Sequence, residues 1–312
     1  MALSCYQRLR QAYPNSELTL LCPEGLEGIV PPGVFNRVWP FKKAELREPR
    51  GRQSWVQQIE SERFDISVSL PASWSSALLF YRARIPFRIG FSQSGSGWLQ
   101  HKSLKWQGMQ SGKHKSVLYQ ELVELVLNSD KTHSSIPARL PQKPSGKKFW
   151  VIAPGAALPL REWPYFPELL HEISQRYPDR TFRVVGTQIE AAWKSRLQRW
   201  GLPRVEDWVG KTSLGNLQQM TQEAELVIAN DSGVAHVAAT LGQARTVVIF
   251  GPGNPQYIAP IGPGVVPVVP AASVTCSPCE KSFCRAPLGY QRCLKEISLD
   301  QVLQKIETAL LL

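Results

Sequence analysis

After residue 148, strand and helix patterns alternate regularly along the chain. Short apolar runs predict strands at Phe149–Ala153, Thr181–Val185, Leu226–Ala229 and Thr246–Phe250. Apolar residues at helical spacing predict helices after Trp163-Pro164 and at Glu190–Trp200, Val234–Leu241 and Leu299–Leu311. Strands that alternate with helices form a parallel sheet covered on both faces, so we expect an α/β fold here.

The first half of the chain shows a fainter version of the same pattern. Strands are predicted at Glu17–Cys22, Ile66–Leu70 and Phe87–Gly90, and helices at Gln53–Glu62 and Val117–Leu127. The chain opens on an amphipathic helix around Leu3–Tyr13 that no strand precedes. Because a parallel β-α-β unit begins with a strand, we expect that the first strand of this domain is missing from the sequence. Either the fold starts half-way, or the recorded start lies inside the gene.

A length of 312 residues predicts two domains. The Ser- and Pro-rich stretch Asn128–Lys148 has little apolar periodicity and is typical of a linker. We therefore predict an N-terminal domain of residues 1–146 and a C-terminal domain of residues 147–312.

Positive charge is concentrated in the N-terminal half. Residues 1–148 hold 21 basic and 11 acidic side chains, whereas residues 149–312 hold 15 and 14. This asymmetry indicates an anionic partner, such as nucleic acid, an anionic membrane surface or an acidic substrate; the plain alternative is a surface tuned for solubility. No apolar run approaches the ~18 residues of a membrane-spanning helix, and the first residues lack a signal-peptide layout, so we expect a cytosolic chain.

The most distinctive motif, Asn230–His236, joins a predicted buried strand to a helix. Ligands of open α/β sheets bind at this end of the strands, where Asp231 stands. Ser232 can cap the helix, Gly233 lets a ligand approach the backbone, and the free N–H groups at the helix start suit a pyrophosphate. His236 lies one turn further, within reach of a sugar or phosphate oxygen. The alternative is an ordinary Asp/Ser helix cap followed by a core histidine.

Loops after neighbouring strands are candidates for the same crevice. Gly251–Pro255 follows a predicted strand and is either a second wall or a rigid turn. Gly155 follows the first strand of this half, and Arg161 beyond it could neutralise a diphosphate; alternatively, Arg161 packs on Trp163. Glu190 could accept hydrogen bonds from ribose hydroxyls, or it is an ordinary surface residue of a helix.

Four of the six cysteines, Cys276, Cys279, Cys284 and Cys293, have the spacing C-x₂-C-x₄-C-x₈-C. Such a set can bind zinc, although Cys₄ zinc sites more often show two paired C-x₂-C arms. The alternative is a loop of partly buried thiols, since a disulfide is not expected in a cytosolic chain. Whether these thiols bind metal stays open, and our site assignment includes no metal.

Together these motifs resemble glycosyltransferase family 9, the ADP-heptose:lipopolysaccharide heptosyltransferases, and above all its heptosyltransferase II branch. Asn230–Ala239 and Phe250–Pro255 are similar to the family's donor loops, and Arg161–Pro164 resembles its Lys/Arg-x-Trp-Pro element. In the first half, Leu70–Trp74 and Ile85–Gly90 resemble the family's acceptor segment. The four-cysteine loop also occurs in many members.

The resemblance implies a GT-B architecture, in which two Rossmann-like domains with parallel sheets face a central cleft. It places the donor, ADP-L-glycero-D-manno-heptose, on the C-terminal domain, against Gly155, Arg161, Glu190, Asp231, Ser232, Gly233 and His236. It places a phosphorylated, Kdo-bearing lipid A core on the N-terminal domain, against Ser73 and Arg88, with peripheral contact to the anionic face of the inner membrane. Family members invert the anomeric centre, need no metal or other cofactor, and bind no nucleic acid.

The sequence departs from the family pattern in three places. The family's catalytic base is an Asp in the loop after the first strand, which would lie upstream of Met1, so the catalytic residue is unknown here. Arg161 replaces the family's phosphate-contacting Lys, and Ala156-Ala157 replaces residues with hydroxyl groups. The alternative is therefore a donor-binding but catalytically silent family member. A nicotinamide oxidoreductase is disfavoured, because no G-x-G-x-x-G follows a predicted strand.

Overall fold

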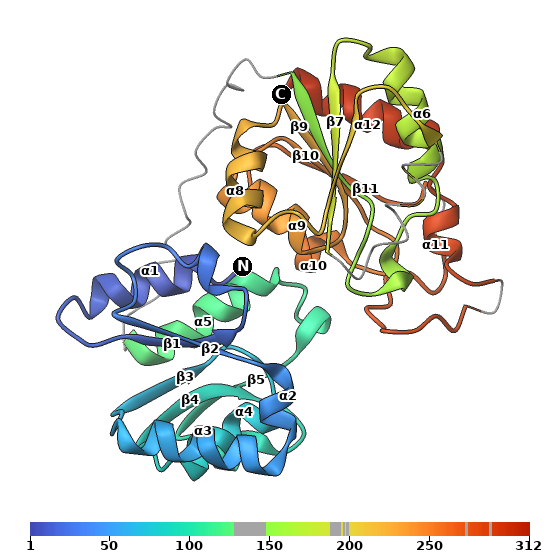
Figure 1. The fold of residues 1–312 in the computed structure, drawn as a ribbon. Coiled ribbons are helices and arrows are strands. Elements are labelled where there is room, and N and C mark those ends of the chain that lie inside the picture. The colour runs from blue at the N-terminus through green and yellow to red at the C-terminus, as the bar shows by residue number, and fades with distance from the viewer. Residues whose placement is uncertain (128–147, 188–194, 196, 198–199, 272–273, 287–288) are drawn as a thin grey trace. The chain divides into compact units, whose positions relative to one another are not determined.

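The computed structural model describes residues 1–127, 148–187, 195, 197, 200–271, 274–286 and 289–312. The chain divides into two α/β units, Met1–Ile136 and Pro137–Leu312 (Figure 1). The predicted boundary at residues 146 and 147 lies outside the described residues, as do Glu190 and most of the helix predicted there. None of the helices described is both long enough and apolar enough to cross a membrane.

In the part of the second unit that the structure describes, six parallel strands form one sheet, in the order β11-β10-β9-β6-β7-β8. The strands are β6 (Phe149–Ala153), β7 (Thr181–Gly186), β8 (Val205–Val209), β9 (Leu226–Asn230), β10 (Thr246–Ile249) and β11 (Val265–Val268). Numbered along the chain from β6 and read from β8, the order is 3-2-1-4-5-6, that of a doubly wound nucleotide-binding sheet. Every residue of β6 and β9 is buried, which explains their continuous apolar runs.

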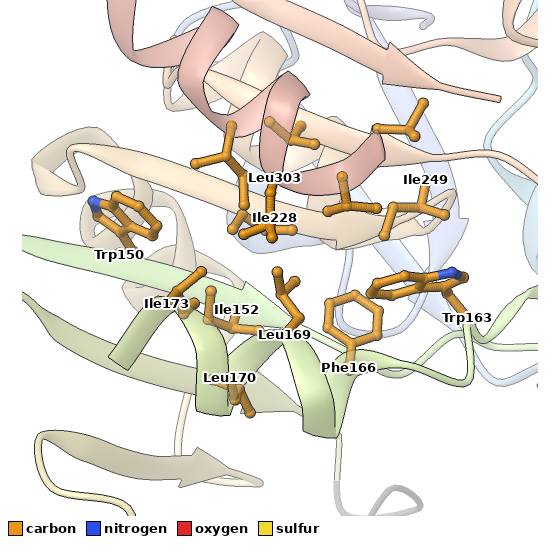
Figure 2. Packing of buried hydrophobic residues seen from close by; sticks show 14 of the residues in the cluster. Trp150, Ile152, Trp163, Phe166, Leu169, Leu170, Ile173, Ile228, Ile249 and Leu303 are labelled. Carbon is orange, nitrogen blue, oxygen red and sulfur yellow. The ribbon is translucent and has the colours of Figure 1, made fainter. Parts of the chain in front are cut away.

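Helices cover both faces of this sheet, with α6 and α12 on one face and α8 and α9 on the other (Figure 1). Their bounds are α6 (Phe166–Arg176), α8 (Leu214–Glu223), α9 (Gly233–His236), α10 (Pro255–Ile258), α11 (Arg292–Lys295) and α12 (Leu299–Leu311). Figure 2 shows Leu169 of α6 and Leu303 of α12 lying against Ile152 and Ile228 of the central strands. Burial of this apolar cluster holds the two central strands rigidly beneath the loops that follow them.

Two details of the second unit differ from the predicted pattern. The helix predicted at Val234–Leu241 begins one residue earlier as α9 and continues as a π-helix over Val237–Leu241. The strands β8 and β11 were not predicted from the sequence. Each lies at an edge of the sheet and contains residues that are only partly buried, so neither has the long apolar run of a central strand.

The described residues of the first unit form five strands in two sheets, β1-β2 and β3-β4-β5, and all of these strands pair in parallel. The strands are β1 (Thr19–Pro23), β2 (Arg37–Phe41), β3 (Ile66–Ser69), β4 (Phe87–Ser92) and β5 (Lys102–Lys105). The helices are α1 (Leu3–Ala12), α2 (Lys43–Arg47), α3 (Pro49–Ser61), α4 (Trp74–Arg82) and α5 (Lys115–Leu127). Figure 1 shows α1 and α5 on one side of the strands and α3 and α4 on the other. The α/β class with parallel sheets is therefore confirmed in both units.

Candidate functional site

The strand order of the second unit reverses between β6 and β9, which pair with each other in the middle of the sheet. In open parallel sheets, ligands bind outside the carboxyl ends of the strands at this point. The loop after β6 carries Gly155 and Arg161, and the loop after β9 carries Asp231–His236. The fold therefore brings every described donor residue of the sequence analysis to one edge of the sheet.

Asn230, the last residue of β9, ties these two loops together. Its buried side chain donates a hydrogen bond to the carbonyl of Pro154 at 2.7 Å and accepts one from the backbone N–H of Trp163 at 3.0 Å. These bonds fix both ends of the loop that holds Gly155 and Arg161. The local sequence around Asn230 does not indicate this role, because it depends on a residue 67 positions away.

Arg161 lies between two carboxylates. Its Nη1 donates to Oδ2 of Asp231 at 2.5 Å, and its Nη2 donates to Oε2 of Glu280 at 3.1 Å. The Arg161 side chain is 19% exposed and that of Asp231 is 5% exposed, so these are largely desolvated ion pairs. Trp163, the other partner considered for Arg161, is itself buried, and its indole N–H donates to the carbonyl of Ile297 at 3.0 Å.

Burial has a direct electrostatic consequence at Asp231. Desolvation raises the pKa of the Asp231 carboxyl to about 6, against the opposing effect of the Arg161 cation, and the Glu280 carboxylate adds to the rise. Asp231 is also crowded by the next loop. A Cβ at position 253 would clash with its Oδ2, so Gly253 is needed for the Gly251–Pro255 loop to approach this closely.

Glu280 belongs to the four-cysteine loop, which lies against the loop after β10. Its Oε1 accepts from the backbone N–H of Asn254 at 2.8 Å, and the backbone N–H groups of Cys279 and Glu280 both donate to the carbonyl of Pro252. Ser277 Oγ donates to the carbonyl of Gly251 at 2.6 Å. The four-cysteine loop thus places a carboxylate beside Arg161, a role that the spacing of its cysteines alone did not indicate.

The four cysteines of this loop are free thiols in the structure. Burial raises the pKa of the Cys293 thiol to about 11, and the nearby Cys279, Cys276 and Cys284 add to the rise. Across the described part of the chain, no group of three or more His, Cys, Asp or Glu side chains is arranged to hold a metal ion.

Ser232, Gly233 and His236 follow Asp231 at the same edge. Ser232 is the residue before α9, but its side chain makes no capping hydrogen bond, which corrects the cap predicted from the sequence. Its Oγ is instead buried without a hydrogen-bond partner among the described residues. A Cβ at Gly233 would meet no atom within 4 Å, so protein packing does not require glycine there. His236 is half-buried at the end of α9 rather than enclosed in the core.

In the first unit, the structure separates Ser73 from Arg88. Ser73 precedes α4 and follows the carboxyl end of β3, whereas Arg88 is the second residue of β4 and lies near the opposite edge of the parallel sheet. The Arg88 guanidinium donates to the carbonyls of Leu99 at 2.7 Å and Ile85 at 2.5 Å. Arg88 therefore supports local structure, and Ser73 alone stands where ligands of parallel sheets bind.

Comparison with known proteins identifies the family. The family model for "Glycosyltransferase family 9 (heptosyltransferase)" matches residues 52–288, which include both the Ser73 segment and the Arg161–Asp231–Glu280 cluster. The chain belongs to glycosyltransferase family 9. It is therefore a glycosyltransferase, and the resemblance drawn from its motifs is confirmed.

Curated relatives of this family 9 chain are heptosyltransferases. Lipooligosaccharide heptosyltransferase 2 of Haemophilus ducreyi is 22% identical over 347 residues, covering 99% of this chain and 95% of the relative. Lipopolysaccharide heptosyltransferase 2 of Escherichia coli K12 is 23% identical over 295 residues, covering 84% and 81%.

Solved structures share the fold of the family 9 chain. The E. coli ADP-heptose lps heptosyltransferase II matches with a TM-score of 0.75 at 19% identity, covering 99% of this chain and 94% of that one. A family 9 glycosyltransferase from Veillonella parvula matches with a TM-score of 0.82 at 18% identity, covering 99% and 93%. These likenesses agree with the GT-B class expected from the sequence.

Proposed function

We propose that this glycosyltransferase takes ADP-L-glycero-D-manno-heptose as its donor and binds it at the carboxyl ends of β6 and β9. One observation carries the proposal: Arg161 Nε and Ser232 Oγ are both buried without partners among the described residues, on the two loops at this edge. Buried polar groups normally have hydrogen-bond partners. The oxygens of a diphosphate would satisfy both donors, and the Arg161 cation would offset its charge.

In this proposal Gly155, Gly233 and His236 complete the donor site. Gly155 is buried in the loop after β6, and the open space at the Gly233 Cβ position leaves room for a ligand close to the backbone. Half-buried His236 would contact a sugar or phosphate oxygen. Glu190, outside the described residues, keeps its proposed role at the ribose.

We propose the lipopolysaccharide inner core as the acceptor, on the first unit. The named relatives are lipopolysaccharide and lipooligosaccharide heptosyltransferases, and the excess of basic residues in the first half suits a phosphorylated, Kdo-bearing lipid A core. Ser73 is the proposed acceptor residue, because it follows β3 at the edge where parallel sheets bind ligands. Its Oγ lies 2.7 Å from Ser75 Oγ, so two hydroxyl groups face this position.

The proposed reaction is an inverting, metal-independent displacement. The bond between the heptose anomeric carbon and the ADP oxygen breaks, ADP leaves with the electron pair, and the acceptor oxygen bonds to the opposite face. A base removes the proton of the acceptor hydroxyl. Arg161 would stabilise the charge that develops on the departing ADP, which is where a fixed cation contributes most to rate.

We also propose peripheral contact with the anionic face of the inner membrane, through a basic and aromatic surface of the first unit. A cavity of about 460 Å³ is lined by Tyr81, Arg82, Arg84, Ile85, Pro86, Arg88 and His101. Trp98, 66% exposed, stacks edge-on with Tyr81 at 5.6 Å beside it. Exposed aromatic rings among arginines suit the boundary between lipid headgroups and acyl chains.

A transfer assay tests the proposed function. The chain is incubated with ADP-heptose and a Kdo₂-lipid A acceptor, and the mass of the lipid product is measured by mass spectrometry. Gain of one heptose by the acceptor supports transfer. Donor binding without product supports the alternative, a donor-binding but catalytically silent family member.

A further inference from the structure

Gln291 is a buried polar residue that stands directly before α11 in the second unit. It is 9% exposed, although glutamine is mostly found at the protein surface. Its backbone has φ 56° and ψ 31°, in the left-handed region that residues other than glycine rarely adopt. Such conformations persist where the surrounding contacts hold them, and they concentrate at functional sites. The contacts of Gln291 therefore indicate its role.

The side-chain amide of Gln291 contacts the backbone on both sides of Arg161. Its Nε2 donates to the carbonyl of Pro159 at 2.6 Å and, more weakly, to the carbonyl of Glu162 at 3.4 Å. Pro159 lies two positions before Arg161, and Glu162 directly follows it. A single side chain therefore spans the short helical turn Pro159–Arg161 that carries the guanidinium.

This contact fixes the middle of the loop after β6. Asn230 holds the two ends of the loop. Between these ends, the Arg161 N–H donates to the carbonyl of Leu158 at 2.8 Å, a bond that closes the turn on itself. The Gln291 amide instead joins the turn to a segment 132 positions away. The loop is thus held at its ends by β9 and in its middle by the residue before α11.

The backbone of Gln291 is itself anchored to the four-cysteine loop and to α11. Its N–H donates to Sγ of Cys284 at 3.4 Å, and its carbonyl accepts from two N–H groups of α11 at 3.0 Å. The four-cysteine loop also places the Glu280 carboxylate against Nη2 of Arg161 at 3.1 Å. One segment therefore contacts both the backbone around Arg161 and its guanidinium, so the direction of this side chain is set from both ends.

We propose that Gln291 is a positioning residue of the donor site, which holds the Pro159–Arg161 turn so that the Arg161 guanidinium meets the diphosphate. This inference rests on the proposed function, because it takes the diphosphate of a sugar nucleotide as the ligand of Arg161. An arginine side chain loses conformational freedom when it binds a ligand, and a backbone already fixed in place lowers that cost. Gln291 acts through Arg161, since its own amide nitrogen is bound to backbone carbonyls.

The proposed role requires a hydrogen-bond donor at the end of the Gln291 side chain. Methionine has a similar length but donates no hydrogen bond, whereas histidine can keep an N–H donor at its Nε2. The Pro159 carbonyl also accepts from the N–H of Glu162 at 3.1 Å, so it keeps a partner when the amide is removed. The variant Gln291→Met therefore tests the position of the turn rather than the cost of an unsatisfied carbonyl.

Calorimetry on the full chain with ADP and with adenosine tests the positioning role. We expect Gln291→Met to weaken the binding of ADP by about five- to tenfold, the loss expected for one hydrogen bond, and the binding of adenosine by less than about twofold. Gln291→His should retain most of the affinity for ADP, because it keeps the donor. The matched control is Gln222→Met, which should leave ADP binding unchanged. Gln222 is an exposed residue of the same unit, and its amide donates to the carbonyl of Leu241 at 3.4 Å.

A measurement without ligand separates this inference from the proposed function. The Arg161 cation opposes the rise in the pKa of Asp231 that burial causes, so a turn that lets Arg161 move away should raise this pKa further above about 6. Titration of the Asp231 carboxyl carbon by NMR measures the change. We expect the pKa to be higher by about 0.5 in Gln291→Met than in the unchanged chain, and to stay the same in Gln291→His and Gln222→Met.

Three results would overturn the positioning role of Gln291. The first is an equal loss of ADP and adenosine binding in Gln291→Met, and the second is an unchanged pKa of Asp231 in that variant. The third is a loss of ADP binding in Gln291→His as large as in Gln291→Met. If Gln291→Met does not fold, Gln291→Asn takes its place, because asparagine adopts the left-handed region more readily but is too short to reach the carbonyls. Absence of ADP binding by the unchanged chain would contradict the proposed function, and the pKa of Asp231 would then decide the role of Gln291 on its own.

Discussion

Arg161 Nη1 donates to Asp231 Oδ2 at 2.5 Å, although the two residues are 70 positions apart in the chain. The pair spans the two loops that follow β6 and β9, at the point where the strand order reverses. Its presence means that a diphosphate reaching Arg161 must compete with a carboxylate already bound there. The ligand affinity of the site is therefore set by how strongly Asp231 and Glu280 hold the guanidinium.

Replacement of Arg161 separates a charge contact from a packing effect. We expect Arg161→Ala to weaken the binding of ADP by about 1.5–3 kcal/mol, the range for a charge-assisted hydrogen bond. The binding of adenosine, which has no phosphate, should weaken much less. Calorimetry with both ligands measures this difference. Because the single variant leaves Asp231 buried without its cation, the double variant Arg161→Ala/Asp231→Asn serves as the folding control. Equal losses for ADP and adenosine in both variants would assign Arg161 to structure.

Removal of the Glu280 charge should have the opposite effect. In Glu280→Gln the guanidinium of Arg161 keeps one carboxylate partner instead of two. We therefore expect ADP to bind about three- to tenfold more tightly, a change comparable to the interaction free energy of a partly exposed ion pair. Glu296→Gln is the matched control, because Glu296 is an exposed carboxylate that pairs with Arg292 within α11. Weaker ADP binding in Glu280→Gln would mean that the carboxylate mainly anchors the loop at Asn254.

Donor affinity should depend on pH through Asp231. The pKa of this carboxyl is raised to about 6, so it loses its negative charge as the pH falls through that value and releases Arg161. Binding of a diphosphate should therefore strengthen by about three- to tenfold between about pH 7.5 and about pH 5.5. ADP-ribose is the suitable probe, because its diphosphate has no group that titrates in this range. The part of this dependence that comes from Asp231 should be lost in Asp231→Asn, and a pH profile unchanged by that substitution would exclude Asp231 as its source.

Membrane contact should require the exposed aromatic rings of the first unit. We expect Trp98→Ala to lower the affinity for anionic phosphatidylglycerol vesicles, measured by sedimentation, by about fivefold. The reason is the loss of one aromatic ring that would insert into the lipid surface. Tyr290→Ala, at a residue of the second unit that is 55% exposed, should leave sedimentation unchanged. Similar behaviour of the two variants would contradict a specific surface around Tyr81 and Trp98.

The sequence predicts the central strands of the second unit well, because strands buried on both faces leave continuous apolar runs such as Phe149–Ala153. The sequence pattern did not predict the strands β2 and β8, and the reason is physical. Each lies at the edge of its sheet, and charged residues such as Arg37 and Glu206 interrupt its apolar pattern. Their pairing depends on neighbouring strands rather than on their own composition.

The residues of the candidate site likewise include some that the local sequence indicates and some that it does not. Asp231, Ser232 and Gly233 are recognisable because they follow a buried strand directly, so local sequence places them at a ligand-binding edge. Glu280 is not recognisable, because it meets Arg161 across 119 positions and lies in a loop whose distinctive sequence feature is its cysteine spacing. Arg88 shows the reverse case: the family resemblance placed it at the acceptor, whereas in the structure its guanidinium donates to two backbone carbonyls.

The most direct test of the donor site is a calorimetric titration of the full chain with ADP-heptose. We expect saturable binding with a Kd well below about 1 mM. ADP-heptose should bind at least about tenfold more tightly than adenosine, because only ADP-heptose carries the diphosphate. Arg161→Ala should remove most of that advantage while the chain stays folded by circular dichroism. Absence of any binding heat at millimolar ADP-heptose, with a folded protein, would contradict the assignment of the β6 and β9 edge as the nucleotide-sugar site.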